Sequence, residues 1–220
     1  MNSIRGYLDQ EDSQWEVRLA QGWSNECREK LLEICSSILR RSEWTDRIQA
    51  ALGSENEVAF SQADQAASAI GIDTWEIHWQ RLQQTPADPG RWYNVMVLCD
   101  ENRIGRVVEF AQRTIDLESI ATGAGDEVGF GPGFEQHRCL GFVLQELNRF
   151  PGWGAKLIDI GLRSPVLRNR NMAVAALAAW SGEGLSSELK YSLEQAAECE
   201  PDDGVRERMQ RVLRGEPLSP

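Results

Sequence analysis

A glycine-rich stretch at residues 122–134, with the sequence TGAGDEVGFGPGF, is the first place in this chain to look for chemistry. Closely spaced glycines can bring backbone amides against a phosphate at the start of a helix. Here the spacing is G-x-G-x-x-x-G, no lysine follows, and Asp126 and Glu127 would repel a phosphate. The stretch is interpreted as a loop that joins two helical hairpins and binds no nucleotide. The alternative is a recognition arm, in which flexible glycines present Phe130 and Phe134 to a partner.

Two pairs of adjacent carboxylates are candidates for acid–base or metal chemistry. They are Asp100 with Glu101 and Asp126 with Glu127. Side chains of adjacent residues point in different directions, so neither pair alone makes a catalytic dyad. The acidic run at residues 198–203 lacks the ligand spacing of a calcium loop. Most of these carboxylates are interpreted as solvated helix caps, and no metal or cofactor is predicted.

His137 and Cys139 raise the possibility of a nucleophile and its base, because they lie two residues apart. On a helix that spacing directs the two side chains to different faces, so they are not expected to act together. His78 lies between two tryptophans and is interpreted as a packing residue. No G-x-S-x-G or H-E-x-x-H motif is present. No catalytic residue is predicted.

The cysteines say more about the cellular compartment of the protein than about any catalytic or metal site. Their number is odd and no two of them form a C-x-x-C motif, which argues against a zinc site of that type. The set suits a reducing environment, and the protein is expected in the cytoplasm. The five residues are Cys27, Cys35, Cys99, Cys139 and Cys199.

Aromatic and basic side chains supply the remaining candidates. Most of the eight tryptophans have helical spacing with other apolar residues and are expected in the core. Trp92 and Trp153 stand next to helix starts, where a partner could reach them. Arg163, Arg168 and Arg170 form the one basic cluster. They are interpreted either as a ladder between neighbouring helices or as a site for an anion.

The charge distribution excludes several partners. The chain carries 23 basic and 34 acidic residues, a net charge of −11, and residues 51–150 alone hold 7 basic against 15 acidic. Nucleic-acid binding depends on basic residues that displace counterions, and an anionic membrane also requires them. The longest apolar run, Met172 to Trp180, is too short for the roughly 20 residues of a membrane span, and no secretory signal is expected. The favoured partner is therefore a basic protein, with no nucleic acid and no membrane.

The elements that must position these residues are helices throughout, since no segment shows sustained strand alternation. One helix is expected from Ser24 with Cys27 and Cys35 on its inner face, another from Ser42 to Gly53, and another between an Asp73 cap and Pro86. A single all-α domain is expected over residues 1–220, with a frayed tail at 215–220. The remaining helices are expected at 92–99, 103–117, 139–147, 153–162, 166–181, 185–198 and 203–214.

Internal repetition indicates how these helices are arranged. A shift of 36 residues places Pro165 on Pro201 and Arg170 on Arg206. The segment EPDDGVRE from Glu200 resembles the turn between the two helices of HEAT repeats, which a Val-Arg pair follows. The resemblance is clearest over residues 130–214, weaker over 73–117, and rests on helical character alone over 1–60. It implies a short right-handed α-solenoid of stacked antiparallel hairpins, in which neighbours cover each other's apolar faces.

These observations favour a non-enzymatic protein–protein interaction module that presents an acidic surface to a basic partner. The alternatives are a bacterial immunity protein that neutralises a cationic toxin, and a small lyase-type enzyme with a tryptophan-lined pocket. Exposed carboxylates along a groove would favour the binding module, whereas a closed pocket with His137 or a cysteine beside a carboxylate would favour the enzyme. The predicted partner-binding residues are Asp100, Glu101, Asp126, Glu127, Phe130, Phe134, Trp92 and Trp153.

Overall fold

A computed structural model describes residues 41–180 and 185–218, with six separate residues before them: Glu26, Glu29, Lys30, Glu33, Ile34 and Ser37. Cys27 and Cys35 of the expected Ser24 helix lie outside the described residues, as do Trp15 and Trp23, whereas Ile34, which the same spacing places on the inner face, is 51% exposed. Within the described ranges every regular element is a helix, and β-type pairing is limited to an isolated parallel bridge between Glu127 and Val166. The all-α prediction is confirmed.

The chain divides into two compact units, Met1–Ile77 and His78–Pro220. The first unit contains α4 (Ser42–Leu52) and α5 (Glu57–Ala69), which pack against each other. The side chain of Asn56 caps α5 by accepting hydrogen bonds from the amides of Val58 and Ala59, at 3.0 Å each. The single domain expected over residues 1–220 stays a prediction. The apolar core of this unit consists of Ile48, Leu52, Phe60, Ala63 and Ala67.

The second unit holds the predicted site residues. α6 (Trp75–Gln84) begins in the first unit and ends in the second, and its start is capped by Asp73 as predicted. The four helices expected between residues 153 and 214 agree with α11 to α14 within two residues at each end. The elements of the second unit are α7 (Pro89–Val97), α8 (Ile104–Thr114), α9 (Leu117–Ile120), α10 (Glu135–Glu146), the 3-10 turn η1 (Leu147–Arg149), α11 (Ala155–Leu162), α12 (Leu167–Trp180), α13 (Ser187–Cys199) and α14 (Asp203–Leu213).

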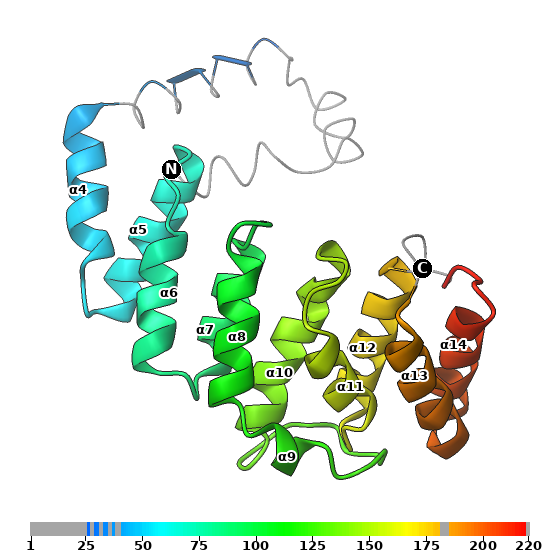
Figure 1. The fold of residues 1–220 in the computed structure, drawn as a ribbon. Coiled ribbons are helices and arrows are strands. Elements are labelled where there is room, and N and C mark those ends of the chain that lie inside the picture. Colours follow the sequence, from blue (N-terminus) through cyan, green and yellow to red (C-terminus); the bar gives the residue numbers. More distant parts are fainter. Residues whose placement is uncertain are drawn as a thin grey trace, which may run out of the picture. The chain divides into compact units, whose positions relative to one another are not determined.

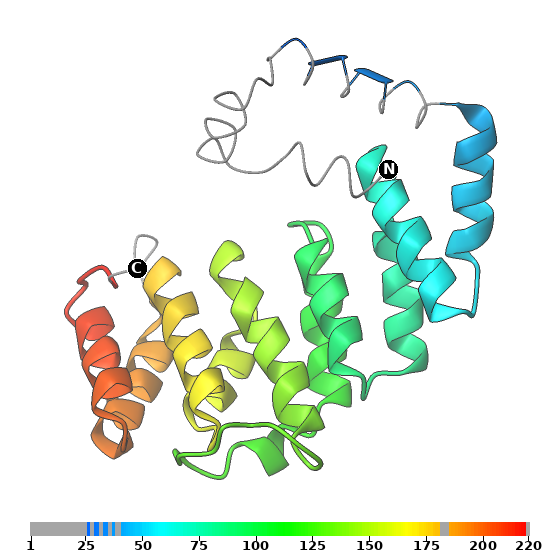
Figure 2. The same cartoon turned by 180° about the vertical axis from the view of Figure 1, so that it is seen from behind.

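The helices of the second unit form two layers (Figures 1 and 2). α10 packs between α7 and α12, and α12 also packs against α14, so these four helices make one layer. α11 contacts α9 and α13 in the other layer, and the pairs α11–α12 and α13–α14 pack across the two. Consecutive helices therefore cover each other's apolar faces. The HEAT-like register of these pairs stays a prediction.

A buried ion pair ties α12 to the turn before α14. Arg170 donates from Nε and Nη2 to the carboxylate of Glu200 at 2.6 and 2.8 Å, and both side chains are fully buried. Arg170 also donates from Nη1 to the backbone oxygens of Ser164 and Pro165 at 2.9 and 3.0 Å. The buried charge of Arg170 is tolerated only because every nitrogen of its guanidinium group has a hydrogen-bond partner.

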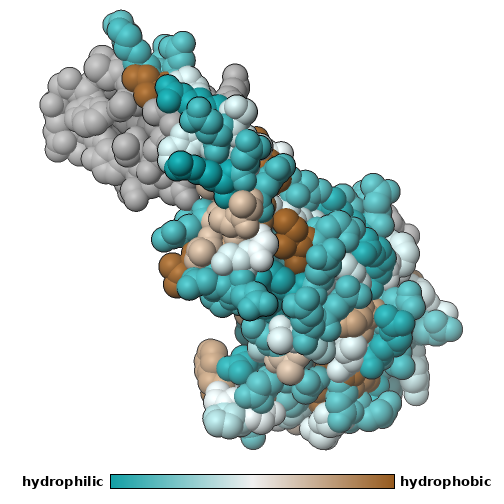
Figure 3. Space-filling model, turned by 90° about the vertical axis from the view of Figure 1, so that its left-hand side faces the viewer, coloured by the Kyte–Doolittle hydropathy of each residue, from teal (hydrophilic) through white to brown (hydrophobic). Residues whose placement is uncertain are grey.

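Most large apolar side chains of the described residues are buried, and few lie at the surface. On the face shown in Figure 3, apolar residues form separate patches in a surface that is otherwise mostly hydrophilic. The most exposed large apolar side chain described is Phe130, at 75%. None of the described helices has both the length and the apolar content that a bilayer crossing requires.

Candidate functional site

The glycine-rich segment is attached to the turn between α11 and α12. The amide of Gly123 donates to the oxygen of Arg163 at 2.9 Å, and the amide of Glu127 donates to the oxygen of Pro165 at 3.2 Å. The oxygen of Glu127 in turn accepts from the amide of Leu167 at 3.1 Å. Backbone hydrogen bonds thus hold both the first half of the segment and its acidic pair against a helix start.

Gly129 is where this segment comes closest to the helices. Its φ is +82°, a conformation that favours glycine, and a Cβ built there would lie 2.7 Å from Cγ1 of Val166. A side chain at this position would therefore both strain the backbone and push the segment away from α12. Beyond it, Phe130 projects into solvent and Phe134 is half-buried with its ring 5.4 Å from that of His137.

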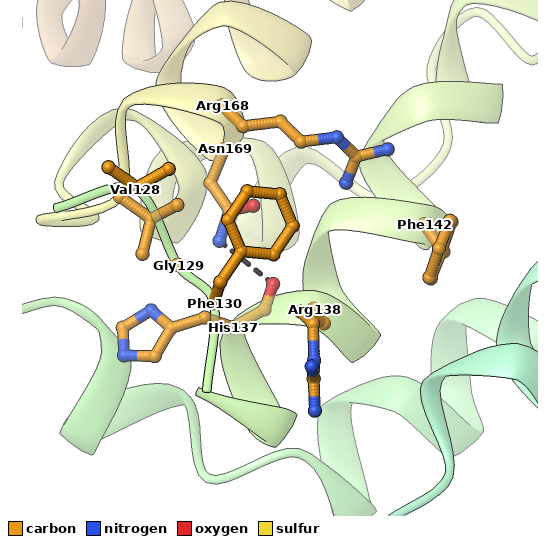
Figure 4. A pocket seen from close by; sticks show the side chains of 9 residues that line it. Val128, Gly129, Phe130, His137, Arg138, Phe142, Arg168 and Asn169 are labelled. Carbon is orange, nitrogen blue, oxygen red and sulfur yellow. Dashed lines mark hydrogen bonds between the residues drawn. The ribbon is translucent and has the colours of Figure 1, made fainter. Parts of the chain in front are cut away.

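A pocket of about 200 Å³ lies where this segment meets α10 and α12 (Figure 4). The segment contributes Val128, Gly129 and Phe130. Helix α10 contributes His137, Arg138 and Phe142, and the start of α12 contributes Val166, Arg168 and Asn169. The lining is largely apolar, with two guanidinium groups and no carboxylate among the described residues.

A glycine on α10 brings the polar end of α12 close to the pocket. A Cβ at Gly141 would lie 2.6 Å from Nη1 of Arg168 and 2.7 Å from Oδ1 of Asn169. The absence of a side chain at Gly141 lets both groups lie directly on α10. From there Asn169 donates to the backbone oxygen of His137 at 2.9 Å, which joins the first turns of the two helices.

Burial and a serine hydroxyl set the environment of His137. Its Nδ1 lies 3.4 Å from Oγ of Ser164, and that hydroxyl accepts from the amide of Val166 at 3.2 Å and from Nδ2 of Asn169 at 3.4 Å. Since both donors point at the Ser164 oxygen, its own proton is free to donate to the His137 ring. Burial lowers the pKa of His137, and the nearby charge of Glu127 opposes that shift.

Cys139 faces away from this pocket. Its side chain is fully buried, and its sulfur lies 3.8 Å from the backbone oxygens of Pro86 and Ala87. Burial is the main cause that raises the pKa of the Cys139 thiol to about 12, with the charge of Asp88 acting in the same direction. The expectation that His137 and Cys139 point to different faces agrees with this arrangement, which contains no activated thiol.

The three arginines of the predicted basic cluster separate into three environments. Arg163 is exposed and pairs with Asp159 at 2.5 Å, Arg168 lines the pocket, and Arg170 is buried on Glu200. They do not converge on one anion. Of the two interpretations left open by the sequence, the ladder between helices describes Arg170, and only Arg168 faces the pocket.

The two acidic pairs lie at opposite ends of the helix layer. The starts of α7 and α10 lie together, because Cys139 contacts the turn before α7. Their ends also lie together, because Arg149 donates to the oxygens of Met96 and Cys99 at 3.3 and 2.7 Å. Asp100 follows the end of α7 and Asp126 precedes the start of α10, so the predicted site residues form two groups rather than one (Figure 1).

At the end of the helix layer that contains Asp100, some of the predicted site residues have a structural role. Asp100 accepts hydrogen bonds from the amides of Asn102 and Arg103 at 3.0 and 3.1 Å, as a solvated cap does. Glu101 is exposed. Trp153 is 45% exposed and lies over α8, with ring atoms 3.0 Å from the Cβ position of Gly105.

For Trp92 the structure corrects the expectation of a partner contact. Its side chain is fully buried and stacks on Phe110, with 5.6 Å between the ring centroids. Its Nε1 donates to the backbone oxygen of Pro86 at 2.8 Å. A residue at a helix start can face the neighbouring helix as readily as solvent, and here the ring fills the space between α7 and α8.

The acidic groups of the described residues do not assemble with histidines or cysteines. No group of three or more such side chains in this part of the chain is placed to hold a metal ion. The residues that sequence reasoning missed are Val128, Arg138, Phe142 and Asn169, which become neighbours only when α10 packs against α12. Comparisons with known proteins found no family model, curated protein or solved structure that matches this chain.

Proposed function

We propose that this protein is a non-enzymatic protein-interaction module that presents an acidic surface to a basic protein partner. The observation that carries the proposal is the segment Asp126–Phe130, which is anchored by backbone hydrogen bonds yet exposes its side chains. Phe130 is 75% exposed, two carboxylates stand beside it, and an aromatic ring on an ordered support is a common energetic centre of protein interfaces.

The charge of the second unit supports a basic partner. His78–Pro220 contains 16 basic and 20 acidic residues. Within its helices several carboxylates are paired with arginines three or four residues away, such as Glu109 with Arg113 at 3.6 Å. Asp126 and Glu127 have no such ion pair within the described part of the chain, so their charge is available to a partner. Exposed charges of this kind set the rate and salt dependence of association.

Repeated hydrogen bonds support the HEAT-like part of the proposal. Arg170 Nη1 donates to the backbone oxygen of Ser164 at 2.9 Å, and Arg206 Nη1 donates to that of Glu200 at 2.6 Å. The side chain of Ser164 also accepts a hydrogen bond from the amide of Val166, two residues further on. In the same way, the side chain of Glu200 accepts one from the amide of Asp202. Both pairs are separated by the 36 residues found in the sequence comparison.

The enzyme alternative has less support. A lyase-type site needs an acid–base group beside a reacting carbon, and the pocket that contains His137 has no carboxylate in its lining. Its aromatic residues are Phe130 and Phe142 rather than tryptophans. One ring nitrogen of His137 lies 3.4 Å from the Ser164 hydroxyl, and the buried Cys139 thiol faces elsewhere.

The test is affinity capture at low salt, followed by direct binding measurements with each recovered basic protein. The variant Asp126→Lys/Glu127→Lys combined with Phe130→Ala is expected to lose the partner. The matched control Glu194→Lys/Glu198→Lys makes the same charge change on exposed positions of α13 and is expected to keep it. Higher salt should weaken wild-type binding. Equal binding by both variants would refute the role of the loop.

A further inference from the structure

The guanidinium of Arg168 is half-buried in the pocket without a carboxylate. Its Nη2 donates to the neutral amide oxygen of Gln145 at 2.7 Å, and its Cζ lies 5.1 Å from the ring centroid of Phe142. No carboxylate of the described residues forms an ion pair with it. Burial lowers the pKa of Arg168, which means that its charged form has lost hydration that no counter-ion replaces. Arg170, two residues on, has its counter-ion in Glu200.

A second cation lies in the same lining. Arg138 is held by Glu135, but loosely, since Nη2 of the arginine is 3.5 Å from the glutamate oxygen. The Nε atom of Arg138 is buried and has no hydrogen-bond partner among the described residues. Two guanidinium groups therefore border a mostly apolar cavity. These two cations line one pocket of a chain that carries a net charge of −11.

The size of the pocket limits what can occupy it. A cavity of about 150 Å³ accommodates benzene, and drug-sized ligands occupy about 300 Å³ or more. At about 200 Å³ this pocket matches one aromatic ring with a short substituent. Phe130, Phe142 and Val166 offer an apolar surface for such a ring.

The charges around the pocket favour a monoanion. A guanidinium fork binds both carboxylate and phosphate. The carboxylate of Glu127 is close enough to act on the pKa of His137 in the lining, and it would repel a phosphate dianion more than a carboxylate. The pocket therefore combines apolar contact, cationic donors and a nearby negative charge.

We propose that this pocket binds a small organic carboxylate that carries one aromatic ring, with the ring against Phe142 and Val166 and the carboxylate on Arg168 and Arg138. The proposal does not depend on a protein partner. It concerns the residues that line the pocket, whereas the proposed interaction uses the exposed carboxylates of the loop, and Phe130 is the residue that both proposals share.

The test compares two probes of nearly the same shape on the wild-type protein by isothermal titration calorimetry. Phenylacetate is expected to bind, and neutral phenylacetamide is expected to bind about tenfold more weakly or worse, because it cannot form charge-assisted hydrogen bonds. Equal affinity of the two probes would overturn the proposal, as would the absence of binding heat from phenylacetate at about 10 mM, which is about ten times a Kd of 1 mM. Binding of inorganic phosphate in preference to phenylacetate would overturn the assignment of a carboxylate.

A pair of variants places the binding in this pocket. Arg168→Gln is expected to weaken phenylacetate binding about tenfold or more, whereas Arg163→Gln, an exposed arginine in the same turn but outside the lining, is expected to leave it unchanged. Circular dichroism and thermal melting establish that both variants are folded. An equal effect of the two substitutions would overturn the proposal, and the probe comparison on wild-type protein stands even if Arg168→Gln does not fold.

Discussion

The buried pair of Arg170 and Glu200 leads to a quantitative prediction about stability. Replacement of Arg170 by methionine keeps an unbranched apolar stem but removes the guanidinium. The carboxylate of Glu200 would then be buried with one remaining donor, the amide of Asp202 at 3.0 Å. The backbone oxygens of Ser164 and Pro165 would each lose a donor as well. Ser164 and Glu200 are buried, so water does not replace their lost partners, whereas Pro165 is only partly buried.

The expected loss is large for a single substitution. Removal of one partner of a buried ion pair typically lowers the free energy of unfolding by about 3–5 kcal/mol. Combination of Arg170→Met with Glu200→Leu removes the uncompensated charge and should recover part of that loss. Recovery should stop about 1–3 kcal/mol below wild type, because the buried backbone oxygen of Ser164 remains without a donor, whereas that of Pro165 keeps the amide of Glu127.

Urea denaturation followed by circular dichroism measures these differences, with the slope of the transition as a check on two-state behaviour. The matched control is Arg163→Met, because Arg163 pairs with Asp159 at a similar distance but is half-exposed. Its loss should be below about 1 kcal/mol. If Arg170→Met and Arg163→Met lower the free energy of unfolding equally, the reasoning from burial is refuted. If Arg170→Met does not fold, the double variant should still fold and be more stable than it.

Two further predictions concern the loop and the thiols. Gly129→Ala should lower the free energy of unfolding by about 2–3 kcal/mol in urea denaturation, because it combines a positive φ with a clash against Val166. Gly131→Ala, with φ +91° and open space around its Cβ position, should cost only about 1–2 kcal/mol, and equal losses would contradict the close approach. At pH 8, with peptide mapping by mass spectrometry, iodoacetamide should label the exposed Cys199 but not the native Cys139, which has about one thiolate in ten thousand molecules. Rapid labelling of Cys139 in the folded protein would show that it is not buried as described.

The helices of the second unit were predictable because their local signals agree with their packing. Asp73 marks the start of α6, and the apolar positions of α11 to α14 recur at helical spacing, whereas α7 begins at Pro89 and α10 at Glu135, ahead of the expected starts at residues 92 and 139. Helix α5 was not predicted, since its inner positions include Ala63 and Ala67, which give a weak periodic signal. Its cap at Asn56 was the signal that could have revealed it.

The solvent exposure of individual tryptophans could not be predicted from their position in a helix. Trp92 and Trp153 both stand near a helix start, and both were expected at the surface. Trp92 is buried because Phe110 of the next helix stacks on it, whereas Trp153 is 45% exposed over Gly105. The difference depends on which residue of a neighbouring helix faces the ring, and periodicity within one helix does not contain that information.

The pocket could not be predicted because three separate close approaches create it. Gly129 lets the loop touch α12, Gly141 lets Arg168 and Asn169 touch α10, and Ser164 joins the first turns of α10 and α12. The sequence identifies the loop, His137 and Arg168 as separate candidates, and it favours a loop that joins two hairpins or presents a recognition arm. Packing adds a second feature, since the carboxylates of Asp126 and Glu127 are exposed while Arg138 and Arg168 line the pocket beside the loop. A segment that is acidic in sequence can therefore border a cationic site, because helix packing rather than composition decides which charges meet.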